Sequence, residues 1–330
     1  MWNYAFQVPE QKKIRYIVHT DCKNEADDQY TLAHILMTDK LDVRGIIAGH
    51  FDRANQGRYP EHQTAQASLD EVHLILDLMG IDHYPVFKGA ETGIPDQDTP
   101  IVTDAARFIV EEAMREDPRP LFIGMQGAIT DLACAILMEP RICERITCIW
   151  IGGGDYPEGG QEFNLMNDVH AANVVFASSM PLWQVPMSVY KQFAVSLAEL
   201  QVRVRPYGKI GHYLFDQMVA LNDRLAAVPQ WPHGETWCLG DEGVICALLE
   251  DRERRGGYTE ISAPRIVRTC AISPGTKTAE SGSITPWTCG LTWKISTPNC
   301  SSISRIKPET AALSRSDSMS AFGQNKAALA

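Results

Sequence analysis

The chain of 330 residues has no apolar run that approaches the roughly 20 residues needed to span a membrane. Residues 1–13 contain no apolar core of the kind found in signal peptides. The nine cysteines form no Cys-x-x-Cys pair, and such an odd, scattered set is typical of reduced thiols rather than of disulfides or a zinc site. We therefore expect a cytoplasmic protein that makes no membrane contact.

Positive charge is also scarce. The chain has 30 Lys and Arg against 41 Asp and Glu, which gives a net charge of -11. This excess argues against nucleic acid as the main partner and is compatible with neutral or cationic small ligands. With 45% hydrophobic and 22% charged residues and no internal repeat, the composition is that of one large globular α/β domain or two ordinary ones.

Apolar runs typical of strands alternate with segments of helical periodicity over most of the chain. The expected strands are 14–18, 41–50, 84–87, 120–125, 146–151 and 182–186. The expected helices are 30–37, 63–80, 104–115, 128–138, 169–179 and 244–249. Such alternation predicts the α/β class, with an open, mostly parallel, Rossmann-like sheet and helices on both faces.

Acidic residues gather directly after the first expected strand. Residues 19–28 read His-Thr-Asp-Cys-Lys-Asn-Glu-Ala-Asp-Asp and lead into a helix, at the sheet edge where ligands bind. Carboxylates this dense repel one another, and an oxygen-loving cation such as Ca²⁺ or Mg²⁺ would relieve the repulsion. Asp27 or Asp28 alone could simply cap the helix, but capping does not explain Asp21.

Three later segments place polar residues at comparable turns. They are Gly-Ala-Ile-Thr-Asp-Leu-Ala at 127–133, Glu-Phe-Asn at 162–164 after three glycines, and Trp-Cys-Leu-Gly-Asp-Glu at 237–242. A carboxylate and an amide two residues apart, as at Glu162 and Asn164, can bond several hydroxyls of a ribose at once. Each segment on its own could also be an ordinary capped helix start, and Asp168 is a good candidate for such a cap.

Taken together and in this order, the four segments resemble the inosine/uridine-preferring nucleoside hydrolase family over roughly residues 14–249. Asp21, Asp27 and Asp28 resemble its aspartate-rich signature, in the longer spacing of a divergent branch with an Asn-Glu-x-Asp-Asp run. Glu162 and Asn164 match a Glu-Phe-Asn segment that holds ribose in that family. The segment 127–133 resembles one in which a backbone carbonyl reaches the metal.

The resemblance implies the nucleoside hydrolase fold and hydrolysis of ribonucleosides to ribose and free base. It implies one Ca²⁺ ion, a small-molecule nucleoside as substrate, and assembly as a homodimer or homotetramer. The implied metal ligands are Asp21, Asp28, Asp241 and the carbonyl of Thr130. Asp21 would also be the general base, and the implied substrate-binding residues are Asp27, Glu162, Asn164 and His50.

The chain departs from the family in three places. His19 stands where the first Asp of the signature is usual, and the loop 155–160 lacks an Asn that often precedes the Glu. Gly240 stands where relatives have a His or Trp that acts on the leaving base. Candidates to replace that residue are Trp231, His233, Trp237 and His50, although a lone His is more often structural.

Two other function classes stay open. A non-catalytic metal- or carbohydrate-binding protein on the same fold would explain Gly240, and a ribose-release assay would separate it from an enzyme. A phosphatase could use Asp21 as a nucleophile, as haloacid-dehalogenase-like enzymes do. That reading needs a later Lys and a second acidic pair in a defined order, and it gives the Glu-Phe-Asn segment no role.

The composition changes near residue 273. From there the chain is rich in Ser, Thr, Pro and Lys, and its apolar periodicity is poor. We predict a single nucleoside hydrolase-like domain over 1–272 and an atypical tail over 273–330. The tail is either a flexible extension or the product of a shifted reading frame.

Overall fold

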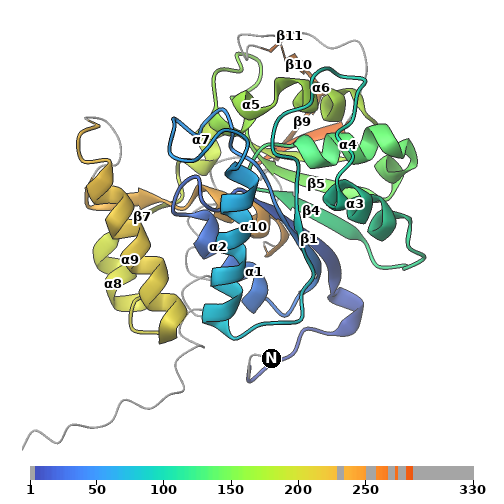
Figure 1. Ribbon diagram of the computed structural model, residues 1–330. Coiled ribbons are helices and arrows are strands. Elements are labelled where there is room, and N and C mark those ends of the chain that lie inside the picture. The colour runs from blue at the N-terminus through green and yellow to red at the C-terminus, as the bar shows by residue number, and fades with distance from the viewer. Residues whose placement is uncertain (1–3, 229–233, 250–257, 267–271, 274–279, 285–330) are drawn as a thin grey trace, which may run out of the picture.

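An eight-stranded sheet forms the centre of the computed structural model, which describes residues 4–228, 234–249, 258–266, 272–273 and 280–284 (Figure 1). The strand order is β3-β2-β1-β4-β5-β6-β12-β9, and neighbours from β3 to β12 are parallel. Only β9, at the edge, is antiparallel. The strands are β1 Ile14–Thr20, β2 Leu41–Ala48, β3 Val86–Lys88, β4 Leu121–Met125, β5 Ile146–Ile151, β6 Leu182–Val185, β9 Tyr258–Ser262 and β12 Glu280–Ile284.

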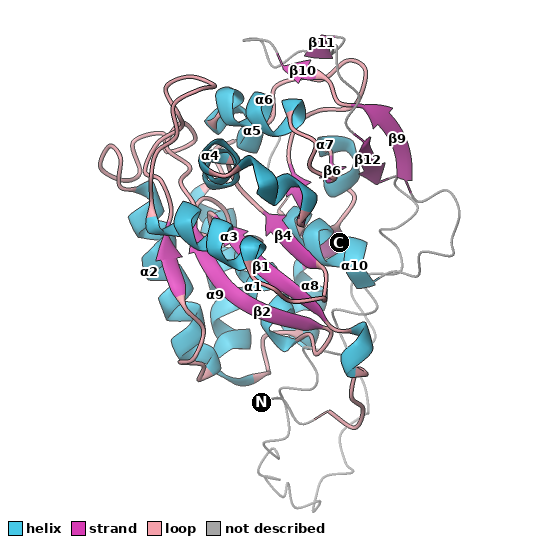
Figure 2. Cartoon of the chain, turned by 90° about the vertical axis from the view of Figure 1, so that its right-hand side faces the viewer, coloured by secondary structure: helices cyan, strands magenta, loops and turns pink. Residues whose placement is uncertain are grey.

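Helices cover both faces of this sheet, which confirms the predicted α/β architecture. Tyr16 and Val18 of β1 pack into one core with α1, α2, α9 and α10, whereas Ile17 packs into the other with α3, α4 and α6. This follows from the strand period of two. Figure 2 shows α3 and α4 in front of the sheet and α1 behind it. These helices are α1 Asp28–Met37, α2 Thr64–Met79, α3 Asp104–Met114, α4 Thr130–Met138, α6 Val169–Ala177, α9 Gly208–Arg224 and α10 Gly243–Leu249.

A segment for which the sequence predicted no elements lies between β6 and α10. It consists of α7 Met187–Tyr190, β7 Ala194–Ser196, α8 Leu197–Arg203, α9, β8 Thr236–Cys238 and the 3-10 turn η3 Gly240–Glu242. β7 and β8 pair antiparallel, and α8 and α9 stand together at one side of the molecule (Figure 1). This pairing brings the chain around residues 190 and 237 to the carboxyl end of the sheet.

The last described strand bears on the predicted domain boundary. β12 lies beyond residue 272 and pairs with β6 and β9, so the sheet itself continues past that point. Residues 285–330 lie outside the described residues, and the division into domain and tail stays a prediction. β10 Arg265–Ile266 and β11 Ile272–Ser273 form a separate two-stranded ribbon. Over the described ranges, no helix is both long and apolar enough to cross a bilayer.

Candidate active site

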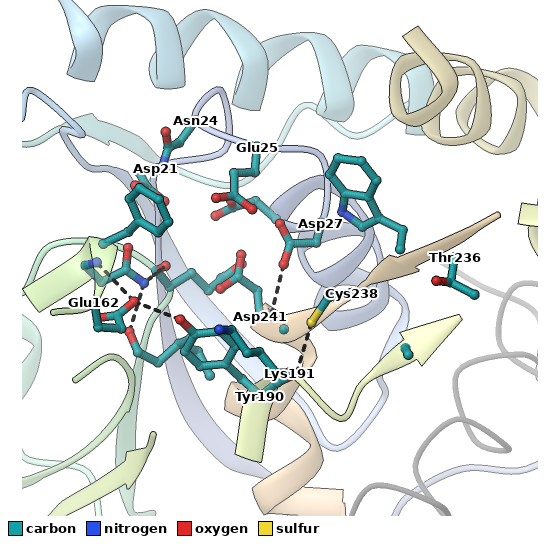
Figure 3. Close-up of a pocket in the computed structure, with 18 of the residues that line it drawn as sticks. Asp21, Asn24, Glu25, Asp27, Glu162, Tyr190, Lys191, Thr236, Cys238 and Asp241 are labelled. Carbon is teal, nitrogen blue, oxygen red and sulfur yellow. Dashed lines mark hydrogen bonds between the residues drawn. The ribbon is translucent and has the colours of Figure 1, made fainter. Parts of the chain in front are cut away.

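The carboxyl ends of β1, β4 and β5 open into a cavity of about 600 Å³. Parallel strands end at one edge of the sheet, so polar turns far apart in sequence meet there. Carboxylates dominate the lining and come from three of the four segments singled out in the sequence (Figure 3). They are Asp21, Glu25, Asp27, Asp28, Glu162 and Asp241.

Three of these carboxylates form a group that could hold a metal ion. Oxygens of Asp27, Asp28 and Asp241 all lie within 4.8 Å of one another, and all three side chains are buried. The group forms because η3 packs against the start of α1, where the Asp241 N–H donates to Asp27 Oδ2 (3.3 Å). The Thr20 hydroxyl donates to Asp28 Oδ1 (2.6 Å). Oxygen ligands of this kind suit a hard divalent cation.

The protonation behaviour of these acids shows how strained the group is without a cation. Burial, and then repulsion from neighbouring carboxylates, raises the pKa of Asp21, Asp27 and Asp241 well above the ordinary value. Burial raises the pKa of Asp28 to about 6 although the Thr20 hydroxyl opposes the shift. Burial and then the charge of Asp28 raise the pKa of Glu25 to about 7. A bound cation would favour the ionised forms.

Asp21 lies beside this group, against the turn that follows β4. Its Oδ2 is buried and has no hydrogen-bond partner among the described residues. A Cβ atom at Gly127 would lie 2.7 Å from the Asp21 carboxyl carbon, so the carboxylate fits only because residue 127 is glycine. The first and second sequence segments therefore meet here, and an unsatisfied carboxylate oxygen is available for a ligand.

Thr130 and His50 do not line the cavity. Thr130 begins α4, where its hydroxyl donates to Asp168 Oδ2 (2.8 Å) and lies 2.8 Å from His50 Nε2. Gln126, which directly follows β4, lines the cavity instead. The turn between β4 and α4 carries Thr130 away from the sheet edge, so the structure does not bring these two predicted residues to the other candidates.

Glu162 lines the cavity and also organises the backbone around it. Its carboxylate accepts N–H bonds from Gly153 (2.7 Å), Asn164 (3.1 Å) and Leu165 (2.9 Å), which caps the short helix α5 Phe163–Asn167. Tyr190 donates its hydroxyl to Glu162 Oε1 (3.2 Å). Most of the hydrogen bonds that the Glu162 carboxylate can accept are therefore made with groups of the protein itself.

Asn164 links the ends of two strands. Its Nδ2 donates to the carbonyls of Gln126 (2.8 Å) and Ile151 (2.9 Å), which follow β4 and end β5. Both amide hydrogens are then engaged, and Oδ1 is left as the acceptor for a substrate hydroxyl. The structure places Asn164 in the cavity as expected, while its role toward ribose stays a prediction.

The acidic loop between β1 and α1 is held from outside. Arg58 donates to the carbonyl (2.5 Å) and side-chain oxygen (2.7 Å) of Asn24. Gln217 of α9 donates to the carbonyl of Ala26 (2.8 Å). These bonds fix the loop that carries Asp21, Glu25 and Asp27.

His19 explains one departure from the family pattern. It is not among the residues that line the cavity, and its Nε2 lies 3.1 Å from Asp131 Oδ2 in a buried pair. Of the candidates for leaving-group activation, Trp237 lines the cavity, whereas Trp231 and His233 lie outside the described residues.

Glu25 and Tyr190 are among the cavity residues that have no role in the sequence-based prediction. Glu25 is part of the acidic run, but its side chain was not assigned. Tyr190 lies in a segment without a chemical pattern, and its ring covers Gly240, where an added Cβ would be 3.0 Å from Tyr190 Cδ2. The pairing of β7 with β8 and the bond from Cys238 Sγ to the Tyr190 carbonyl bring Tyr190 and Gly240 together.

Residues 16–285 match the family model described as inosine-uridine preferring nucleoside hydrolase. The chain belongs to this family. The match runs through all four segments that line or flank the cavity and ends just after β12. The predicted resemblance is therefore confirmed.

Individual nucleoside hydrolases are similar over shorter stretches. The chain is 27% identical over 174 residues to an inosine-uridine preferring nucleoside hydrolase of Leishmania major, an alignment that covers 44% of this chain and 55% of that one. It is 26% identical over 194 residues to a pyrimidine-specific ribonucleoside hydrolase of Citrobacter koseri, covering 51% and 59%. The chain thus spans little more than half the length of these relatives.

Solved structures show the same fold over a longer range. A purine-preferring ribonucleoside hydrolase from Gardnerella vaginalis superimposes with a TM-score of 0.68 at 16% identity. The superposition covers 88% of this chain and 99% of that one. At this identity the likeness supports the nucleoside hydrolase fold rather than a shared substrate.

Proposed function

We propose that the protein hydrolyses the N-glycosidic bond of ribonucleosides to give ribose and a free base. The observation that carries this proposal is one cavity in which three carboxylates that could hold a metal ion, an unsatisfied Asp21 and the pair Glu162 and Asn164 lie together. Membership of the nucleoside hydrolase family supports the same reaction. A neutral or cationic nucleoside also suits an acidic cavity.

Asp28 and Asp241 would hold a Ca²⁺ ion, and we add Asp27 to this ligand set because its carboxylate lies within 4.8 Å of theirs. When bound, the ion would supply a water of lowered pKa and a contact for ribose hydroxyls. Asp21 would take the proton of that water through its free Oδ2 while the water oxygen bonds to the anomeric carbon.

The remaining residues would orient the sugar. Asn164 Oδ1 and the carboxylates of Asp27 and Glu162 can accept bonds from its hydroxyls. As the bond to the base loosens, the ribose becomes oxocarbenium-like, and nearby carboxylates stabilise that charge more than the ground state. The family resemblance further predicts a homodimer or homotetramer in the cytoplasm.

The test is ribose release from a panel of ribonucleosides, with EDTA and with Ca²⁺ restored. We expect metal-dependent release that Asp21→Ala lowers by about two to four orders of magnitude, as for loss of a general base. Asp77→Ala, at an exposed position of α2, is the matched control and should keep full activity. Release that survives both EDTA and Asp21→Ala would refute the metal-dependent mechanism, and no release from any ribonucleoside would refute the hydrolysis.

A non-catalytic binding protein is the second candidate. Two features favour it. The Glu162 carboxylate already accepts backbone hydrogen bonds, and Gly240 has no side chain that could act on the leaving base. Calorimetry would then show Ca²⁺ and ribose binding in the absence of any ribose release.

A further inference from the structure

One cavity carboxylate has no part in the reaction proposed above. Glu25 lines the cavity but does not belong to the group formed by Asp27, Asp28 and Asp241. The Gln29 amide donates to the Glu25 backbone carbonyl (3.4 Å), and Figure 3 shows the Glu25 side chain among the residues that line the cavity. A ligand group can therefore reach it.

The aromatic ring of Tyr190 lines the cavity opposite Glu25. Tyr190 lies against Gly240, its hydroxyl donates to Glu162 Oε1 (3.2 Å), and Cys238 Sγ donates to its carbonyl (3.1 Å). Figure 3 shows Glu25 and Tyr190 entering the cavity from opposite sides. Both residues line the same cavity.

The charge around Glu25 is poorly balanced. Among the described residues that line the cavity, Lys191 is the single basic one, against six carboxylates. Arg58 lies near enough to favour the ionised form of Glu25. Its guanidinium, however, already bonds to Asn24 and to the carbonyls of Ala54 and Asn55. Glu25 lies outside the group proposed to hold the ion, so a positively charged ligand could pair with its carboxylate.

We propose, building on the hydrolysis above, that Glu25 and Tyr190 hold the leaving base and select aromatic bases that carry a positive charge. N7-alkylated purine and pyridinium ribosides are of this class. A carboxylate pairs with the charge, and the tyrosine face attracts a cation lying over it. When the C1′–N bond breaks, the base keeps both electrons and leaves neutral. Water supplies the oxygen that bonds to C1′, and its proton passes to Asp21. The base therefore needs no proton in order to leave.

The test compares 7-methylinosine with inosine, which differ by one methyl group and one charge, on the Ca²⁺-loaded protein. Glu25→Gln should lower kcat/KM for 7-methylinosine by about 10- to 100-fold, mainly through KM. The same substitution should change kcat/KM for inosine by less than about 3-fold. Tyr190→Leu should also reduce the preference, whereas Tyr190→Phe, which keeps the ring, should retain most of it. Glu61→Gln, on an exposed glutamate, is the matched control.

An equal loss for both substrates would overturn the inference, and so would weaker Ca²⁺ binding by Glu25→Gln, which would make Glu25 a metal ligand. If the native protein releases ribose from neither compound, the proposed hydrolysis is refuted. The role of Glu25 is then tested separately by measuring equilibrium binding of the two nucleosides. Tighter binding of 7-methylinosine that Glu25→Gln removes would support it. Equal binding of the two nucleosides would refute it.

Discussion

At the scale of single residues, the site depends on how closely side chains approach the backbone. The Asp21 carboxylate occupies the space that a side chain at residue 127 would need. Tyr190 does the same at Gly240. These glycines are therefore required by packing against a particular neighbour, which explains their presence better than a turn preference alone.

Gly127→Ala tests this contact. The new Cβ would lie 2.7 Å from the Asp21 carboxyl carbon, so we expect a loss of about 1–3 kcal/mol in the free energy of unfolding, measured in urea. The same change in an Asp21→Ala background should cost clearly less, because the group it meets is gone. Equal costs in the two backgrounds would show that the contact is not the cause.

The buried acids predict an unusual pH dependence for the metal-free protein. The pKa of Asp28 rises from 3.8 to about 6 and that of Glu25 from 4.5 to about 7 on folding. Between about pH 4 and 7 the folded state then binds more protons than the unfolded state, so stability falls as pH rises through this window. Denaturant midpoints measured from pH 4 to 8 in EDTA should decrease.

Saturating Ca²⁺ is the control for this dependence, because the bound ion favours the ionised carboxylates and should remove the fall. A midpoint that rises with pH in EDTA would contradict the assignment of these raised pKa values.

At the scale of elements, the turn between β1 and α1 is positioned by groups outside it. Arg58 holds Asn24, and Gln217 of α9 holds Ala26. The late segment between β6 and α10 therefore supports the acidic loop as well as closing the cavity. Its strands β7 and β8 have three residues each, which is too short for a period of two to be recognised in sequence.

Arg58→Ala should loosen the acidic loop without unfolding the protein. We expect about a tenfold loss of kcat/KM, since removing hydrogen bonds from a charged donor costs about 1.5–3 kcal/mol locally. Amide hydrogen exchange should rise over residues 22–27 and stay unchanged in β4. Arg107→Ala, at an exposed position of α3, is the control. Unchanged exchange in Arg58→Ala would show that other contacts hold the loop.

At the scale of the whole molecule, the metal group joins parts of the chain that are far apart. Asp27 and Asp28 start α1, whereas Asp241 precedes α10, the last helix in the described part of the chain. A ligand bound by all three stabilises the folded state only, because the unfolded chain does not assemble the group.

Calcium should therefore raise global stability. At a free concentration 100 times the dissociation constant, the gain expected is about 2.7 kcal/mol in the free energy of unfolding, measured by denaturant titration. Asp241→Ala should abolish the gain, and Asp77→Ala should keep it. If neither Ca²⁺ nor another divalent cation shifts the transition of the native chain, the metal site is not functional.

The sequence by itself determined the order of the main strands and helices as far as β6, the parallel sheet and the family. These features follow from local apolar periodicity and from short runs such as residues 19–28. Both signals lie within a few consecutive residues, so they can be recognised without knowledge of the tertiary contacts. The sequence also placed Asp21, Asp28, Asp241, Glu162 and Asn164 in one cavity, because parallel strands end at one edge.

Only the tertiary structure decided which of these side chains meet. It grouped the Asp27 carboxylate with those of Asp28 and Asp241, turned His50 toward Thr130, and set Tyr190 over Gly240. Periodicity gives the face of an element but not the distance between elements far apart in sequence. That distance is fixed by how η3 packs on α1 and how β7 pairs with β8, through contacts that no local pattern records.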